Sequence, residues 1–473
     1  MRKMQFKKGK IEKKYLVVLA AFVAAAVLLG TAAGILVGRG GGNLPAWLTV
    51  IVIILLVALP LLVLALLFAV AGEKRAEPSA APRGSAAENG GTASEGGGAA
   101  AEGETAEPVP AKGQKTRFDG LTRIDGRREA FGREQFDDDV TLPVLCREFR
   151  NFAAGCLGLY YEESDIRRFV AGLAVSHIMI LQGMSGTGKT SLAYAFGEYL
   201  GNPSAVIPVQ PMWKERTDLI GYYNEFTRRF NETDLLKKMY EANYSRKIYI
   251  TVLDEMNIAR VEYYFAEFLS LLELPDADKR NLAVVSDEWR SDPLQFDDGH
   301  IRLPANMWFI GTANNDDSTF AISDKVYDRA MVMELERKAE PFAAERPARR
   351  CISAQRFAEL TGYAKRDYGL TERDLRRLKR LDAYLTDKCR VTFGNRIMKQ
   401  ISEYVAVYAA CGGDALEALD DILAKKVLRK LSMQNPVFIK NIGGDLCKFL
   451  DGLFGEENMP LCRDFVRRLE QMI

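Results

Sequence analysis

Histidine is nearly absent from this chain, which has only His177 and His300 among its 473 residues. A histidine-based metal cluster or a Ser-His-Asp triad would have almost nothing from which to be built. The seven cysteines are scattered singly, form no Cys-x-x-Cys pair and are odd in number. They are therefore expected to be reduced thiols and not a disulfide framework or a zinc site. Hydrolytic chemistry in this chain must depend on carboxylates, lysine, arginine and a metal ion.

An excess of either charge is also missing, because the formal net charge is +1. This balance gives no global signature of polyanion binding. The charges are nevertheless distributed unevenly along the chain. A basic N-terminus and two uncharged apolar stretches precede an acidic-leaning segment and a mixed-charge remainder. The length is sufficient for two or three domains, including an α/β core and a helical satellite.

Two long apolar stretches, residues 15–37 and 47–70, contain no charged residue. At about 1.5 Å per helical residue, each can cross a hydrocarbon core of about 30 Å. A cleaved signal peptide is the alternative for the first stretch, and buried soluble helices are the alternative for both. Lysine and arginine are dense in residues 1–14 and only Arg39 lies between the stretches, so the basic end is predicted to stay in the cytoplasm. The prediction is an integral membrane protein with two transmembrane helices within residues 15–72 and a cytoplasmic catalytic domain.

Residues 73–116 consist largely of Ala, Gly, Glu, Pro and Ser and contain no aromatic residue. Such a segment cannot bury a core, so it is predicted to be a disordered tether with an end-to-end distance of roughly 33–40 Å. Beyond it, short apolar runs alternate with helical patterns, which predicts an α/β domain with a parallel sheet over residues 117–345. Residues 346–473 show helical spacing only and are predicted to form a helical lid domain. The predicted strands are residues 178–181, 205–209, 248–253, 307–310 and 331–335.

A complete G-x-x-x-x-G-K-[ST] motif follows the first apolar run and opens an amphipathic helix. Strand, glycine loop and helix form the context in which backbone N–H groups close around phosphates. Lys189 is expected to reach the β- and γ-phosphate oxygens, and the Thr190 hydroxyl to ligate Mg²⁺. An ordinary glycine turn is the alternative. The predicted phosphate-binding residues are Gly183, Ser185, Gly186, Thr187, Gly188, Lys189 and Thr190.

Two acids, Asp254 and Glu255, follow the apolar run of residues 248–253. Ligand sites in open α/β sheets form at the carboxyl ends of strands. Asp254 is therefore expected to join the Mg²⁺ shell, and Glu255 to polarise the attacking water. Asn314 ends a third run and is expected to orient that water from the far side of the γ-phosphate. The alternatives are a strand that runs into an acidic turn and a hydrogen-bonded loop amide.

With these motifs in place, residues 178–335 resemble the AAA+ ATPases of the MoxR and McrB group, which have a dynein-related domain. GMSGTGKT is similar to their Walker A, TVLDEMN to Walker B and GTANN to sensor 1. Residues 217–222 look like the loop that follows the second strand in this group. Residues 294–303, with a turn at Asp298-Gly299, resemble its hairpin before sensor 1.

The resemblance implies further roles. It places Arg329 as the arginine finger and Arg396, in the sequence FGNR, as the sensor 2 arginine of the lid. It also implies ATP or GTP as the nucleotide, Mg²⁺ as the metal ion, and a homo-oligomer in the form of a hexameric ring.

Three functions agree with the sequence. The first is a membrane-anchored AAA+ ATPase that remodels or translocates an unknown protein partner. The second is a McrB-like GTPase that supplies force to a nucleic-acid-cleaving partner, which is the only reading that brings in nucleic acid. The third is a nucleotide-gated scaffold without sustained turnover, against which the intact Glu255 argues.

Overall fold

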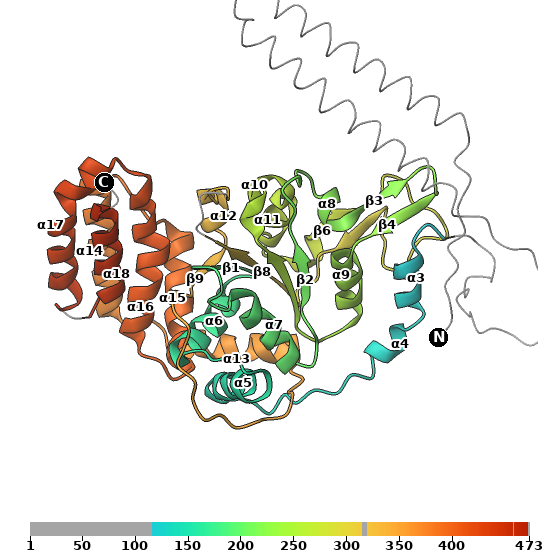
Figure 1. Cartoon of the computed structure of the whole chain (residues 1–473), viewed down its shortest axis with the longest axis horizontal. Helices are drawn as coiled ribbons and strands as arrows, with labels where there is room; N and C mark the ends of the chain where they lie inside the picture. The colour runs from blue at the N-terminus through green and yellow to red at the C-terminus, as the bar shows by residue number, and fades with distance from the viewer. Residues whose placement is uncertain (1–115, 315–318, 457, 472–473) are drawn as a thin grey trace, which may run out of the picture. The chain divides into compact units, whose positions relative to one another are not determined.

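A five-stranded parallel sheet organises the part of the chain that the computed structural model describes, residues 116–314, 319–456 and 458–471 (Figure 1). The strand order is β2-β5-β8-β1-β9, with β2 and β9 at the two edges. All five strands predicted from apolar runs are confirmed, with ends that differ by a few residues. Their bounds are β1 Ile178–Gln182, β2 Ala205–Pro208, β5 Tyr249–Asp254, β8 Met307–Ala313 and β9 Met331–Glu334.

The central strands are apolar nearly throughout because both faces of the sheet are covered. Along β1, Met179 and Leu181 belong to one buried cluster, whereas Ile178 and Ile180 belong to another on the opposite face. This alternation follows from the period of two of a β-strand. The sheet is therefore the middle layer of three, and its carboxyl edge is left to the loops.

Different helices cover the two faces (Figure 1). The first cluster contains apolar residues of α5 Leu142–Leu157, α6 Glu163–Val175 and α7 Lys189–Tyr199. The second contains those of α3 Asp119–Asp125, α9 Asp234–Tyr244, α10 Val261–Tyr264 and α11 Ala266–Leu272. Short elements complete this part: α4 Arg128–Phe131, α8 Thr217–Ile220, α12 Asp324–Tyr327 and the 3₁₀ turns Met256–Ile258 and Ala277–Lys279.

Two hairpins project from the three-layer core, and the sequence predicted only part of one. The first joins β3 Gly221–Asn224 to β4 Arg229–Glu232, and the second joins β6 Asn281–Ala283 to β7 His300–Arg302.

The hairpin predicted over residues 294–303 is wrong in its first arm. Its turn exists, because Asp298 and Gly299 have φ values of 48° and 72°. The partner of β7, however, is β6, with Leu282 opposite Ile301. These two side chains are buried at 0% and 1% exposure, whereas Leu294 is 60% exposed and contributes nothing to the core. Burial therefore selects the earlier apolar segment as the partner strand.

The C-terminal region is helical, as predicted. Helix α15 packs against α6 of the core and against α13, while α17 packs against α18. The bounds are α13 Ala354–Asp367, α14 Glu372–Cys389, α15 Asn395–Ala410, α16 Ala415–Ile422, the π-helical turn Leu423–Val427, the 3₁₀ helix Leu428–Met433, α17 Pro436–Phe454 and α18 Pro460–Gln471.

The predicted membrane spans and the predicted tether lie outside the described residues. Within the described ranges, no helix has both the length and the apolarity needed to cross a membrane.

Candidate active site

The glycine loop, residues 183–190, leads from the carboxyl end of β1 into α7. Gly183, Gly186 and Gly188 have φ values of 143°, 79° and 93°, a region that favours glycine. A Cβ on Gly183 would meet the Leu335 carbonyl oxygen at 2.2 Å. The loop can therefore pass beside β9 only if glycine occupies this position.

Lys189 is the first residue of α7, and its side chain folds back over the loop. The residue is 7% exposed, and its Nζ donates hydrogen bonds to the carbonyl oxygens of Gly183 at 2.9 Å and Met184 at 2.7 Å. Ser185 and Gly186 are exposed at the tip, whereas Thr187 is buried and donates to Met184 O at 3.0 Å. The ammonium group is thus held against the glycine loop, where it can contact phosphate oxygens.

Three oxygen-bearing side chains from neighbouring elements meet beside the loop. Thr190 Oγ1 donates to Asp254 Oδ1 at 2.7 Å, and Thr312 Oγ1 donates to the same oxygen at 2.8 Å. The register explains the meeting, because Leu253 on β5 lies opposite Gly311 on β8, and the next residues along the two strands are Asp254 and Thr312. Thr312 also accepts the backbone N–H of Glu255 at 2.9 Å.

Glu255 follows β5 in a left-handed conformation, with a φ of 53°, and its side chain is exposed. Two residues later, buried Asn257 donates through Nδ2 to the carbonyl oxygen of Asn314 at 2.9 Å. This bond ties the turn after β5 to the residue that follows β8. The predicted catalytic residues Glu255 and Asn314 therefore belong to two loops that are joined to each other.

The residues present at this edge fit a nucleotide with Mg²⁺. A hydroxyl and a carboxylate, those of Thr190 and Asp254, are hard oxygen donors of the kind Mg²⁺ prefers, and they already lie within 2.7 Å of each other. A cavity of about 600 Å³ is lined by Glu162, Asp165 and Glu334, among others. None of its lining residues belongs to the glycine loop. Tyr161, which precedes Glu162, donates through its hydroxyl to Gly188 O at 3.0 Å.

Arg329 and Arg396 lie together at the opposite edge of the sheet. Arg329 lies two residues before the start of β9, and its carbonyl oxygen accepts a hydrogen bond from Ser176 Oγ just before β1. Glu273 binds both guanidinium groups, that of Arg329 at 3.0 Å and that of Arg396 at 2.7 Å. A cavity of about 360 Å³ opens beside these three residues and the first residue of β1, Ile178.

The separation of the two edges follows from the strand. From Ile178 to Gln182, β1 spans roughly 13 Å at about 3.3 Å per residue, with the arginines at its amino end and the glycine loop at its carboxyl end. The structure thus brings Arg396 together with Arg329, and not with the glycine loop of its own chain.

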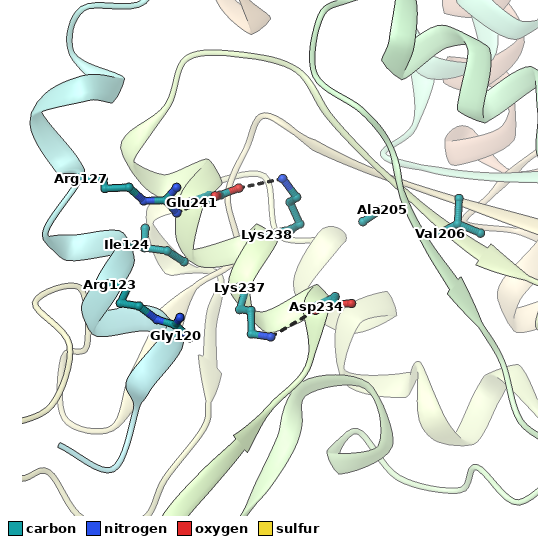
Figure 2. Close-up of a pocket in the computed structure, with 10 residues that line it drawn as sticks. All are labelled: Gly120, Arg123, Ile124, Arg127, Ala205, Val206, Asp234, Lys237, Lys238 and Glu241. Atoms are coloured by element: carbon teal, nitrogen blue, oxygen red, sulfur yellow. Dashed lines mark hydrogen bonds and ion pairs between the residues drawn. The ribbon is translucent and has the colours of Figure 1, made fainter. Parts of the chain in front are cut away.

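A larger cavity, of about 760 Å³, lies elsewhere, against the edge strand β2 and between α3 and α9 (Figure 2). β5 and β8 separate β2 from β1 and the glycine loop. Four of the charged groups that line the cavity are paired, Lys237 with Asp234 at 3.2 Å and Lys238 with Glu241 at 2.9 Å. This surface is separate from the nucleotide site.

Sequence reasoning missed Thr312, Tyr161 and Glu273. Thr312 lies inside the GTANN segment, so the expected strand end could have identified it. Tyr161 and Glu273 have no motif of their own and reach the site only through the fold.

Comparisons with known proteins agree with this geometry. A family described as AAA domain (dynein-related subfamily) matches residues 178–330, and a domain of unknown function (DUF8727) matches residues 348–472. The type IV methyl-directed restriction enzyme EcoKMcrB subunit of Escherichia coli strain K12 is 27% identical over 176 residues, which are 35% of this chain and 36% of that protein. The match thus spans about a third of the relative's length.

Two solved structures are similar at low identity. A protein described as a candidate ATPase from Cytophaga hutchinsonii has a TM-score of 0.41 and 11% identity, with coverage of 65% of this chain and 88% of that one. A full-length MCM homolog from Methanopyrus kandleri has a TM-score of 0.35 and 12% identity, with coverage of 68% and 64%.

The strand–glycine loop–helix geometry, the family match and the similarity to the McrB subunit lead to one conclusion. Residues 178–330 form an AAA domain of the dynein-related subfamily, and their similarity to the McrB subunit supports an AAA+ ATPase of the MoxR/McrB group.

Proposed function

We propose that this chain is a membrane-anchored AAA+ ATPase that hydrolyses ATP with Mg²⁺ and, as an oligomeric ring, remodels or translocates a protein partner. The observation that carries the hydrolytic part is the convergence of Lys189, Thr190, Asp254 and Glu255 at the carboxyl edge of one sheet. The membrane part is supported by the two uncharged apolar stretches, residues 15–37 and 47–70.

Each residue of the proposed site has a defined task. Lys189 offsets the charge of the β- and γ-phosphates, which the glycine loop surrounds with its backbone. Glu255 takes the proton of the attacking water, and Asn314 orients that water. Thr190 and Asp254 would hold Mg²⁺, which neutralises charge that develops on the phosphates.

Arg329 is proposed to act on the nucleotide of a neighbouring subunit. The support is its position, because it lies at the amino edge of the sheet while its own glycine loop is at the carboxyl edge. Arg396 shares this edge and is proposed to serve the same neighbouring nucleotide. A site shared in this way needs an oligomer, and a ring gives every subunit the same two neighbours.

A second candidate is a GTPase that drives a nucleic-acid-cleaving partner, since the curated relative is a subunit of a restriction enzyme. The two functions differ in nucleotide and in stimulus. ATP preference with stimulation by a membrane or protein partner supports the first function, whereas GTP preference with stimulation by DNA supports the second. A scaffold without turnover is less favoured because Glu255 is intact at the turn after β5.

The test is nucleotide hydrolysis by the purified full-length protein with Mg²⁺ and either ATP or GTP. Lys189→Ala should abolish nucleotide binding measured by calorimetry, because it removes the ammonium group at the glycine loop. Lys214→Ala, at an exposed lysine outside the loop, is the matched control. Unchanged nucleotide affinity in Lys189→Ala, with the fold intact by circular dichroism, would remove the assignment of the site.

A further inference from the structure

One buried lysine of the helical region donates to the backbone on both sides of Arg329. Lys426 is 5% exposed, and its Nζ donates hydrogen bonds to the carbonyl oxygens of Tyr327 at 2.6 Å and Ala330 at 2.6 Å. A third, longer bond reaches the carbonyl oxygen of Asp328 at 3.4 Å. Three carbonyl groups on both sides of Arg329 therefore converge on one ammonium group, which has three protons to donate.

The local conformation around Lys426 is unusual and places it for this contact. Residues Leu423–Val427 form a π-helical turn between α16 and a 3₁₀ helix. Such turns are rare, and those that are found often lie at functional sites. The turn buries two consecutive lysines with different partners, since Lys425 binds Asp421 at 2.8 Å while Lys426 binds the carbonyl oxygens. Lys425 is therefore a natural control for Lys426.

Tyr327 connects the same segment to the glycine loop. The guanidinium carbon of Arg429 lies 3.1 Å from the centre of the Tyr327 ring, and Arg429 also binds Asp324 at 2.8 Å. On its other side, the Tyr327 hydroxyl accepts a hydrogen bond from the side-chain amide of Gln182. Gln182 is the last residue of β1 and directly precedes Gly183. The segment that carries Arg329 is thus fixed at once by the helical region and by the strand that leads into the nucleotide site.

We propose that Lys426 is a positioning residue for hydrolysis, because its ammonium group fixes the turn from which Arg329 reaches the neighbouring subunit's nucleotide. The inference rests on the proposed role of Arg329. It adds that the helical region must hold the turn that carries this arginine. Without Lys426, three carbonyl oxygens lose their common donor in a site closed to water. Ser176 and Gln400 still donate to the carbonyl oxygens of Arg329 and Asp328, but the turn loses the one donor that joins its two sides, so Arg329 is less often in place.

Lys426 should also make this requirement depend on pH. Burial lowers the pKa of Lys426 to about 7, and the nearby cations Arg429, Lys430 and Arg396 lower it further, whereas Asp328 acts in the opposite direction. Below this pH the group has three protons for three carbonyl oxygens. Above it, the neutral amine has only two protons, so the hold on the turn weakens as pH rises.

The test compares Lys426→Met with Lys425→Met in the full-length protein. Lys426→Met should lower kcat by at least about tenfold, but by less than the roughly 10³–10⁵-fold that complete loss of an arginine finger costs. It should change KM for the nucleotide by less than about threefold. Hydrogen exchange at the amides of residues 328–330 should become faster. Lys425→Met also removes a buried lysine of the same turn, but it should leave kcat and this exchange unchanged. An unchanged kcat in folded Lys426→Met overturns the proposal.

A second test uses the wild-type protein, so it does not depend on whether a variant folds. Its kcat should fall as pH rises from about 7 to about 9, the range in which Lys426 loses its proton. Lys426→Arg keeps the charge at every pH in this range, so its kcat should not show this fall. A wild-type kcat that is constant from pH 7 to pH 9 overturns the proposal.

Failure of this inference can be distinguished from failure of the proposed function. If Lys426 acts through Arg329, then Lys426→Met should cause no further loss in an Arg329→Ala background. If Arg329→Ala itself leaves hydrolysis unchanged, the proposed role of Arg329 is wrong, whatever Lys426 does. If Arg329→Ala removes hydrolysis and Lys426→Met does not, only the inference about Lys426 is wrong.

Discussion

Glu255 combines an unfavourable backbone conformation with the central place in the proposed chemistry. A left-handed φ of 53° costs a residue with a Cβ about 1–2 kcal/mol. The cost is offset locally, because Thr312 accepts the Glu255 N–H and donates to Asp254. Strained residues of this kind cluster at functional sites. The Thr312 hydroxyl therefore fixes both acids of the site, one through its backbone and one through its side chain.

Glu255→Gln should retain nucleotide binding and lose hydrolysis. The amide keeps the shape of the side chain and cannot accept the proton of water, so turnover should fall by about 10²–10⁴. Single-turnover hydrolysis and calorimetric titration with ATP and Mg²⁺ measure the two effects separately. Glu225→Gln, at an exposed acid in the β3–β4 hairpin, is the control and should keep the wild-type rate. Wild-type turnover in Glu255→Gln would mean that another group is the base.

At the scale of elements, the helical region is joined to the core by a buried charge network. Asp421 of α16 accepts a hydrogen bond from the Tyr404 hydroxyl at 2.7 Å and binds Lys425 at 2.8 Å and Arg168 of α6 at 3.5 Å. Burial raises the pKa of Asp421, but the attraction of Lys425 and Arg168 outweighs burial, and the pKa is lowered. Asp421 therefore remains ionised between α6 and α15.

Asp421→Asn should destabilise the protein by about 3–5 kcal/mol at neutral pH, because it leaves Lys425 buried without its carboxylate partner. Urea unfolding of the full-length protein measures the loss. Asp464→Asn removes an exposed pair, 3.9 Å from Arg467, and should cost only about 0–1 kcal/mol.

The effect of Asp421 should depend on pH with a definite sign. Since its folded pKa is lowered, its contribution is complete above the unfolded value of about 3.9 and is lost as pH falls through the folded pKa. The difference in the free energy of unfolding between wild type and Asp421→Asn should therefore become smaller only in acid. An equal difference at neutral pH and in strong acid would contradict the assigned pKa shift.

The sequence was a good guide to the strands and a poor guide to their less regular neighbours. Five apolar runs became five parallel strands, because strands buried on both faces must be apolar throughout. The partner of β7 could not be read in the same way, since β6 is only three residues long and its apolar pattern is short. The motifs identified Lys189 and Asp254, whereas contacts across distant segments, such as Glu273 with both arginines, are produced by the fold alone.

At the scale of the whole molecule, the proposed orientation in the membrane is a separate prediction. A cysteine introduced by Gly41→Cys, between the two apolar stretches, should react with an impermeant thiol reagent on intact cells. One introduced by Gly97→Cys, in the predicted tether, should react only after the cells are opened. The native cysteines all follow residue 145, so they should contribute no signal in intact cells if the catalytic domain is cytoplasmic. Labelling of Gly97→Cys alone in intact cells would reverse the orientation.

The proposed sharing of a site between subunits predicts that two inactive variants restore each other. Arg329→Ala should lose hydrolysis by about 10³–10⁵ while retaining nucleotide binding. In a mixture with Glu255→Gln, some interfaces combine the intact Glu255 of one subunit with the intact Arg329 of its neighbour. ATPase activity should therefore reappear at intermediate mixing ratios, provided that the subunits exchange. No recovery despite demonstrated co-assembly would mean that Arg329 acts within its own subunit or only structurally.

The glycine loop and the arginines lie at opposite ends of β1, and this arrangement determines how many complete sites an assembly has. In an open row of subunits that share their sites as proposed, one terminal subunit has a glycine loop that no neighbour completes, and the other terminal subunit has arginines with no nucleotide to reach. An open row therefore has one complete site fewer than it has subunits, so a pair has a single complete site. Closure of the row removes both ends at once. Hydrolysis per subunit should thus increase with the length of the row and reach its full value only when the last gap is filled.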